Sequence, residues 1–205
     1  MKLSVVIPFY NEENMIQKMY DELVKEINQI TKAEFEIIFI NDGSKDRTFE
    51  RMLAIAAGDS RVKYISFSRN FGKEAGTIAG LEYATGEAVI LMDGDLQHPP
   101  AMLPKMIEAY EQGYDVVSAR RTRTGEKRHR TFLAKHFYKL ANKMMDIELM
   151  DGVSEFRLFS RKVVNAIISM QEYNRFSKGI FAWIGFNEKV IEYENQVRTV
   201  GETKY

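Results

Sequence analysis

Short apolar runs alternate along the chain with segments in which apolar residues recur every three or four positions. Apolar, β-branched runs of this length predict buried strands, and the longer spacing predicts helices with one apolar face. The predicted strands are Leu3–Pro8, Phe35–Ile40, Val62–Ser68, Ala88–Met92 and Tyr114–Ala119. The predicted helices lie between them, over residues 12–30, 46–57, 73–84 and 101–111. This alternation predicts an α/β fold with a doubly wound, mostly parallel sheet.

Polar clusters follow the first four predicted strands, at the point where each strand ends. They are Tyr10-Asn11-Glu12, Asn41-Asp42-Gly43-Ser44, Arg69-Asn70-Phe71-Gly72-Lys73 and Asp93-Gly94-Asp95. Ligands of doubly wound sheets bind beyond the carboxyl ends of the strands, where such clusters meet. We therefore expect one binding site at this edge of the sheet.

The last cluster contains two carboxylates one residue apart, Asp93 and Asp95. Carboxylate oxygens are hard ligands that suit Mg²⁺ or Mn²⁺, with substrate phosphate and water completing the coordination. Asp and Gly are also common turn residues, so the pair by itself is compatible with a plain turn. No G-x-G-x-x-G follows the first strand and no Walker A lysine loop is present, which argues against a dinucleotide dehydrogenase or a P-loop phosphotransferase.

Composition narrows the class of protein. At 205 residues, with 45% hydrophobic and 28% charged residues, the chain has the size and composition of one soluble globular domain. It contains no cysteine, which excludes disulfides, thiolate metal sites and cysteine nucleophiles. The first apolar run is too short for a signal peptide, and no stretch approaches the roughly 20 apolar residues that span a bilayer. We therefore expect a cytoplasmic protein.

Basic residues concentrate in one segment, although the formal net charge of the chain is zero. Residues 120–143 contain nine Lys or Arg and one acid, Glu126, which predicts a local anionic partner. Residues 130–145 have the pattern of a helix with an apolar stripe and a basic face, which fits either a membrane interface or an ordinary surface helix on the sheet. No nucleic-acid-binding motif accompanies the basic residues, so we expect no nucleic acid partner.

Eight motifs, in this order along the chain, resemble those of glycosyltransferase family 2 and, within it, of the polyprenyl-phosphate sugar transferases. They are Val6–Glu12, Asn41–Ser44, Arg69–Lys73, Met92–Pro100, Glu155–Leu158, Asn174–Phe176, Ala182–Phe186 and Arg198–Tyr205. The resemblance implies a glycosyltransferase A-type fold. It also implies inverting transfer of a sugar from a nucleotide sugar, with UDP-sugars favoured, to a polyprenyl phosphate such as undecaprenyl phosphate. Residues 1–119 would bind the nucleotide sugar and the metal, and residues 120–205 would form the acceptor and membrane-surface half of the same catalytic domain.

The resemblance further implies roles for individual residues. The residues expected to bind the nucleotide are Pro8, Tyr10, Glu12, Asp42, Lys73 and Asp93, with Asp42 accepting a hydrogen bond from the base. Asp95, helped by Gln97, would hold Mg²⁺ or Mn²⁺ on the diphosphate. The residues expected to bind the acceptor phosphate, mostly through bidentate guanidinium groups, are Arg157, Arg175, Arg198 and Lys204. The catalytic set is Asp93, Asp95, Arg120, Glu155 and Arg157.

Two residues of these motifs need separate interpretation. Glu155 stands where similar transferases often have Asp, and its longer side chain favours a role in orienting an arginine. No strong base is needed, because a phosphate monoester, with its second pKa at about 6, is mostly dianionic at neutral pH. For His98 we favour a role in organising the turn over a role as a metal ligand.

Two other functions remain open. A family 2 transferase that acts on a saccharide or protein hydroxyl would need a competent base, for which Glu155 is the candidate. A catalytically silent nucleotide-sugar-binding module would bind without turnover, although intact Asp93, Asp95 and Gln97 argue against it. Similar enzymes commonly continue into membrane-spanning helices after the motif that ends here at Tyr205. We therefore expect peripheral, weaker attachment to the cytoplasmic face of the membrane through residues 120–143; a homo-oligomer is compatible with the sequence.

Overall fold

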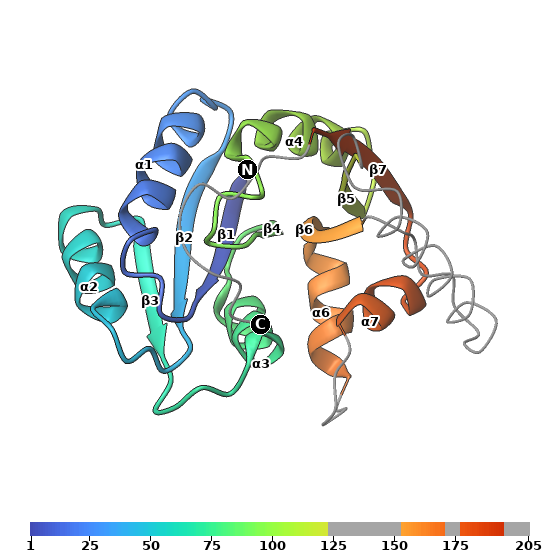
Figure 1. Ribbon diagram of the computed structural model, residues 1–205. Helices are drawn as coiled ribbons and strands as arrows, with labels where there is room; N and C mark the ends of the chain where they lie inside the picture. The colour runs from blue at the N-terminus through green and yellow to red at the C-terminus, as the bar shows by residue number, and fades with distance from the viewer. Residues whose placement is uncertain (123–152, 171–176, 195–205) are drawn as a thin grey trace.

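Seven strands form one mixed sheet in the computed structural model, which describes residues 1–122, 153–170 and 177–194 (Figure 1). The strands are β1 (Lys2–Phe9), β2 (Glu34–Asn41), β3 (Val62–Ser66), β4 (Ala88–Leu91), β5 (Val116–Arg121), β6 (Val153–Ser160) and β7 (Glu188–Tyr193). The helices are α1 (Ile16–Ile27), α2 (Thr48–Gly58), α3 (Lys73–Tyr83), the 3₁₀ turn η1 (Pro100–Met102), α4 (Leu103–Glu111), α6 (Arg161–Ser169) and α7 (Ser177–Trp183). All nine elements that the sequence predicts up to Ala119 are present, with ends shifted by a few residues.

The strand order is β3-β2-β1-β4-β6-β5-β7, and one strand runs against the others. β6 pairs antiparallel with both β4 and β5, whereas the remaining neighbours pair in parallel. The predicted mostly parallel sheet is therefore confirmed. No pattern in the sequence predicted β6, α6, α7 or β7, and the helix predicted over residues 130–145 lies outside the described residues.

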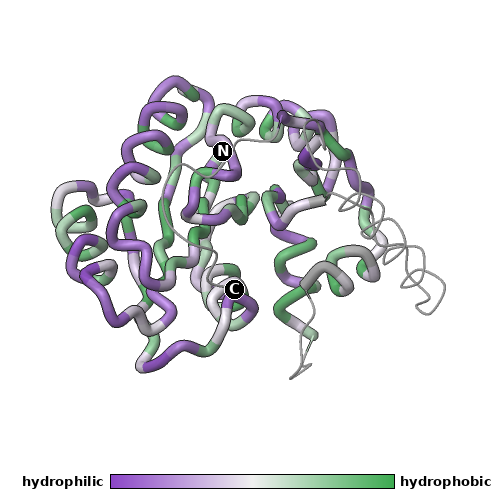
Figure 2. Tube along the Cα trace, in the orientation of Figure 1, coloured by the Kyte–Doolittle hydropathy of each residue, from purple (hydrophilic) through white to green (hydrophobic). Residues whose placement is uncertain are grey.

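Helices cover both faces of the sheet. The core on one face joins odd-numbered β1 residues such as Val5 and Ile7 to α1, α2 and α4, and the core on the other face joins Val6 to α3, α6 and α7. Figure 1 shows these two groups of helices on opposite sides of the sheet. In Figure 2 the central strands β1 and β4 are mainly green and α1 is largely purple, as expected when the centre of a sheet is buried on both faces and a helix on one.

Glycines bring α3 close to β1. A Cβ at Gly80 would lie 2.2 Å from Val6 Cγ1, and a Cβ at Gly76 would lie 3.6 Å from Pro8 Cβ. Helix and strand can approach this closely only because Gly80 carries no side chain, whereas a Cβ at Gly76 would make an ordinary van der Waals contact. The approach sets the beginning of α3, and with it Lys73, beside the carboxyl ends of the central strands.

A buried carboxylate ties the amino ends of the same strands together. Glu36 of β2 is 3% exposed and accepts hydrogen bonds from Ser4 Oγ (2.6 Å), the Thr85 amide (2.6 Å) and Lys63 Nζ (2.7 Å). Burial by itself would raise the pKa of Glu36, but these hydrogen bonds outweigh it and lower the pKa to about 2. Glu36 is therefore ionised and satisfied at neutral pH, at the edge of the sheet opposite the predicted site.

None of the helices in the described ranges is long and apolar enough to cross a bilayer.

Candidate active site

The loops after β1 and β2 are joined by hydrogen bonds at the carboxyl edge of the sheet. The Asn11 amide donates to Ser44 Oγ (3.0 Å), and the Lys45 amide donates to Asn11 Oδ1 (2.7 Å). The Glu12 amide donates to Thr48 Oγ1 (2.8 Å) at the start of α2. These contacts hold the segment of Tyr10 and Glu12, both half-buried, against the loop that follows Asp42.

Asp42 holds the loop after β3. Its carboxylate is fully buried and accepts hydrogen bonds from the amides of Phe71 (2.7 Å) and Gly72 (3.0 Å). Burial raises the pKa of Asp42, and the two amide hydrogen bonds act in the opposite direction. Gly43 makes the approach possible: its φ is +64°, and a Cβ there would lie 2.2 Å from the carbonyl carbon of Arg69. Both carboxylate oxygens accept hydrogen bonds from the loop after β3. The contact between Asp42 and a nucleotide base stays a prediction.

Lys73 connects the loop after β4 to β6. Its Nζ lies 2.5 Å from Asp93 Oδ1 and 2.5 Å from Glu155 Oε2. Burial would lower the pKa of Lys73, but the two carboxylates raise it above its ordinary value, so the side chain is a fixed cation. The structure thus brings three predicted site residues from α3, the β4 loop and β6 into direct contact.

The loop after β4 is shaped by Gly94, Asp95 and Leu96. A Cβ at Gly94 would lie 2.3 Å from the Phe9 ring, so the backbone here rests directly on β1. Asp95 Oδ1 accepts a hydrogen bond from the Gln97 amide (3.0 Å), and Leu96 between them has a φ of +60°. This turn fixes the Asp95 carboxylate two residues beyond Asp93.

The loop after β4 contains the residues predicted to bind a divalent metal ion, Asp95 and Gln97. Among the described residues no three His, Asp or Glu side chains lie together in a way that could hold a metal ion. Mg²⁺ and Mn²⁺ nucleotide sites commonly use one or two carboxylates and complete their coordination with substrate phosphates. Asp95 is half-buried and has one oxygen outside its hydrogen bond to Gln97, which fits a site of that kind.

His98 organises the same turn, as predicted. Its Nδ1 accepts a hydrogen bond from the Asp93 amide (3.0 Å), and its Nε2 lies 3.7 Å from Asp93 Oδ2. The ring stacks on Phe156 of β6, with centroids 5.2 Å apart and an interplanar angle of 14°. The side chain is almost fully buried; burial lowers the pKa of His98, against the raising effect of Asp93.

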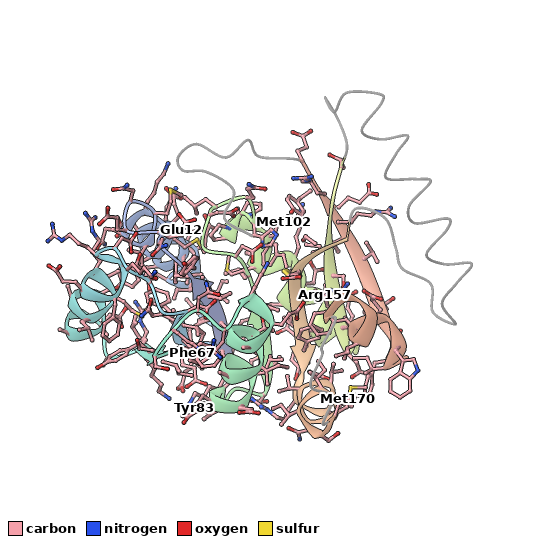
Figure 3. The ribbon with its side chains drawn as sticks, turned by 60° about the horizontal axis from the view of Figure 1, so that its bottom comes forward. Glu12, Phe67, Tyr83, Met102, Arg157 and Met170 are labelled. Atoms are coloured by element: carbon pink, nitrogen blue, oxygen red, sulfur yellow. The ribbon has the colours of Figure 1, made fainter. Side chains whose placement is uncertain are left out.

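Arg157 is buried two residues beyond Glu155 on β6 and lies inside the outline of the molecule in Figure 3. Its Nη1 lies 3.4 Å from Glu188 Oε1, and its guanidinium carbon lies 5.1 Å from the centre of the Phe181 ring. Burial lowers the pKa of Arg157, while Glu188 and Glu155 raise it. Its Nε has no hydrogen-bond partner within the described residues, which leaves one edge of the guanidinium unsatisfied.

The other predicted site residues make no described contact with Lys73, Asp93 or Glu155, or lie outside the described residues. Arg120 of β5 pairs with Glu192 of β7 and is not joined to Asp93 or Glu155 by the described contacts. Pro8 is buried against α3. Arg175, Arg198 and Lys204 lie outside the described residues.

Sequence reasoning missed the residues that support this site. Glu188 and Phe181 contact Arg157, and Phe156 supports His98, yet the sequence indicated no site role for any of the three. They come from β6, α7 and β7, whose places in the sheet depend on pairing between distant segments. Only the position of Phe156 between Glu155 and Arg157 in one motif hinted at its importance.

Comparisons with known proteins agree with this geometry. The family described as Glycosyl transferase family 2 matches residues 4–168. A putative glycosyltransferase CsbB of Bacillus subtilis is 50% identical over 203 residues, which are 99% of this chain and 61% of that protein. A prophage bactoprenol glucosyl transferase homolog of Escherichia coli is 44% identical over 206 residues, covering 100% of this chain and 67% of that protein. The chain thus spans about three-fifths to two-thirds of the length of these relatives.

Solved structures show the same fold. A glucosyl-3-phosphoglycerate synthase from Mycobacterium tuberculosis, in complex with Mn²⁺, UDP-glucose and phosphoglyceric acid, superposes with a TM-score of 0.60 at 19% identity. The match covers 98% of this chain and 72% of that one. The sheet and its helices therefore form the glycosyltransferase A-type fold. The chain belongs to glycosyltransferase family 2.

Proposed function

We propose that this chain carries the catalytic domain of an inverting, metal-dependent glycosyltransferase that moves a sugar from a UDP-sugar to a polyprenyl phosphate. The observation that carries the proposal is the contact of Lys73 with both Asp93 and Glu155, because it joins the acidic β4 loop to β6 at the ligand-binding edge of the sheet. The likeness to a bactoprenol glucosyl transferase homolog, over 100% of this chain and 67% of that protein, supports a polyprenyl acceptor and makes glucose the first sugar to test.

The donor half of the site would use the acids after β4. Asp95 and Gln97 would hold Mg²⁺ or Mn²⁺ against the diphosphate, and the ion, when bound, neutralises charge on the departing nucleoside diphosphate. Lys73 compensates the charge of Asp93, so that Asp93 can lie close to an anionic donor without a full negative charge facing it. Tyr10, Glu12 and Asp42 are proposed to line the nucleotide pocket.

In the acceptor half, the protein has to position the lipid phosphate and does not have to supply a strong base. A lipid phosphate oxygen would attack the anomeric carbon as the bond from that carbon to the diphosphate breaks, which inverts the centre. Since a phosphate monoester is mostly dianionic at neutral pH, it attacks without losing a proton. Glu155 accordingly serves as a partner of Lys73 and needs no role as a base. Arg157, Arg175, Arg198 and Lys204 are proposed to bind the acceptor phosphate.

The proposal includes contact between the basic segment, residues 120–143, and the membrane surface. Residues 120–143 are strongly basic, and an anionic membrane surface would attract them. The described basic residues of this segment, Arg120 and Arg121, end β5 at the ligand-binding edge. A basic surface there would keep the catalytic domain close to lipid-borne phosphate at the cytoplasmic face.

The substitution Glu155→Gln distinguishes the acceptor classes. If the acceptor is a phosphate, Glu155→Gln should lower kcat by about tenfold or less, since it weakens only the contact with Lys73. If the acceptor is a hydroxyl and Glu155 is the base, the loss should approach about 10³-fold. Rates are compared with short-chain polyprenyl phosphate and with saccharide acceptors, and a loss of the larger size with the phosphate acceptor would contradict the proposal.

A further inference from the structure

One side chain, His98, holds the Asp93 backbone in place through a hydrogen bond. His98 Nδ1 accepts a hydrogen bond from the Asp93 amide at 3.0 Å, across the turn of residues 93–98 that contains Asp95. A ring nitrogen that accepts a hydrogen bond carries no proton, so the tautomer of His98 is set with its N–H at Nε2. Nε2 lies 3.7 Å from Asp93 Oδ2. The same imidazole therefore lies next to both the backbone amide and the side-chain carboxylate of Asp93.

The ring is itself held in place by β6. His98 is 5% exposed and stacks at 14° on Phe156, and Phe156 packs edge-on against Tyr193 of β7 at 6.4 Å. Phe156 belongs to the core on the α1, α2 and α4 face of the sheet, whereas its neighbours Glu155 and Arg157 point to the other face. Lys73 joins Asp93 to Glu155 from that second face. The β4 loop is thus fastened to β6 on both sides.

We infer that His98 is a positioning residue for the donor site: by accepting the Asp93 amide while stacked on Phe156, it sets where the Asp93 and Asp95 carboxylates stand for a metal-bound nucleoside diphosphate. The inference rests on the proposed function and extends it to a residue that touches neither donor nor metal. Removing the acceptor breaks the hydrogen bond that the Asp93 amide donates to His98 Nδ1, at a cost in free energy. The Asp93 peptide would then rotate toward another acceptor and displace Asp95 two residues later.

Two substitutions distinguish the effect of the hydrogen-bond acceptor at His98 from the effect of ring stacking on Phe156. In His98→Asn the Oδ1 atom stands close to where Nδ1 was and can accept the Asp93 amide, while the stack on Phe156 is lost. In His98→Phe the stack is kept and the acceptor is lost. Each variant is the control for the other, because both remove an imidazole from the same buried position.

The measurement is calorimetric binding of UDP with Mn²⁺ and with EDTA, on variants whose thermal unfolding shows a folded chain. We expect His98→Phe to weaken the Mn²⁺-dependent binding by about tenfold and to leave the binding in EDTA unchanged. His98→Asn should stay within about threefold of the wild type in both. In transfer assays the loss in His98→Phe should appear in KM for the nucleotide sugar and for Mn²⁺ before it appears in kcat.

The outcomes are distinct. Mn²⁺-dependent binding in His98→Phe equal to that of the wild type, or equal losses in both variants, would overturn the positioning role and leave the proposed function standing. No Mn²⁺-dependent UDP binding by the wild type would overturn both. A test that needs no substitution is the ¹⁵N–¹⁵N coupling across the Asp93 amide and His98 Nδ1: its presence is expected in the wild type, and its absence would overturn the inference even if a variant failed to fold.

Discussion

The contribution of the buried Glu36 carboxylate to the folding free energy can be predicted from the structure. The hydrogen bonds from Lys63, Ser4 and Thr85 lower its pKa from 4.5 to about 2 despite its burial. At about 1.4 kcal/mol for each pH unit, this shift corresponds to about 3 kcal/mol of folding free energy. Because Lys63 is half-exposed and its interaction is screened by solvent, we expect about 2 kcal/mol.

The sign of the pH dependence follows from the direction of the shift. A carboxyl group whose pKa is lower in the folded state stabilises the fold at pH values above its unfolded pKa. The contribution of Glu36 is therefore complete above pH 4.5 and is lost as the pH falls from 4.5 toward 2. Glu36→Gln keeps the volume and one acceptor oxygen but removes the charge, so the variant should be less stable at pH 7 and should approach the wild type at pH 2 to 3.

Urea unfolding followed by circular dichroism at pH 7 and at pH 3 measures this difference. The matched control is Glu34→Gln, two residues earlier on β2, where the side chain is exposed. We expect the control to differ from the wild type by less than about 0.5 kcal/mol at both pH values. A Glu36→Gln difference that is the same at pH 7 and pH 3, or a control that loses as much, would refute the electrostatic account of Glu36.

Three further predictions concern the site. Lys73→Met should cost about 2 kcal/mol in urea unfolding and weaken UDP binding, whereas Lys73→Arg should retain most of both; equal behaviour of the two would show that the charge of Lys73 is unimportant. Asp95→Asn should abolish Mn²⁺-dependent UDP binding in calorimetry with unchanged unfolding, and intact binding would remove Asp95 from the metal site. Gly43→Ala should destabilise by about 2–3 kcal/mol, whereas Gly58→Ala, with open space around it, should not; a neutral Gly43→Ala would contradict the close approach to Arg69.

The first half of the fold could be predicted because its signals are local. Each strand from β1 to β5 is a separate apolar run, and each helix between them has its own periodicity. β6 and β7 have no such advantage. β6 inserts antiparallel between β4 and β5, and β7 joins the far side of β5, so their places depend on pairing between segments distant in the chain.

The site divides in the same way. The carboxyl-edge loops could be predicted to meet, since parallel strands bring their ends together. The partners of individual side chains could not. Lys73 reads from the sequence as a nucleotide ligand and is found bridging Asp93 and Glu155. Asp42 reads as a contact for a base and is found buried under two loop amides. Both outcomes depend on how closely neighbouring loops approach, which no periodicity encodes. For Asp42 the approach is possible because Gly43 carries no side chain against Arg69.

The measurement that tests the central claim most directly is a transfer assay. The protein is incubated with Mg²⁺ or Mn²⁺, a short-chain polyprenyl phosphate and labelled UDP-glucose beside other labelled nucleotide sugars, and the products are extracted into organic solvent. The account predicts metal-dependent label in the organic phase, highest with a UDP-sugar and absent in Asp95→Ala. Label transferred only to saccharide or protein hydroxyls, or metal-dependent nucleotide binding without transfer to any acceptor, would contradict it.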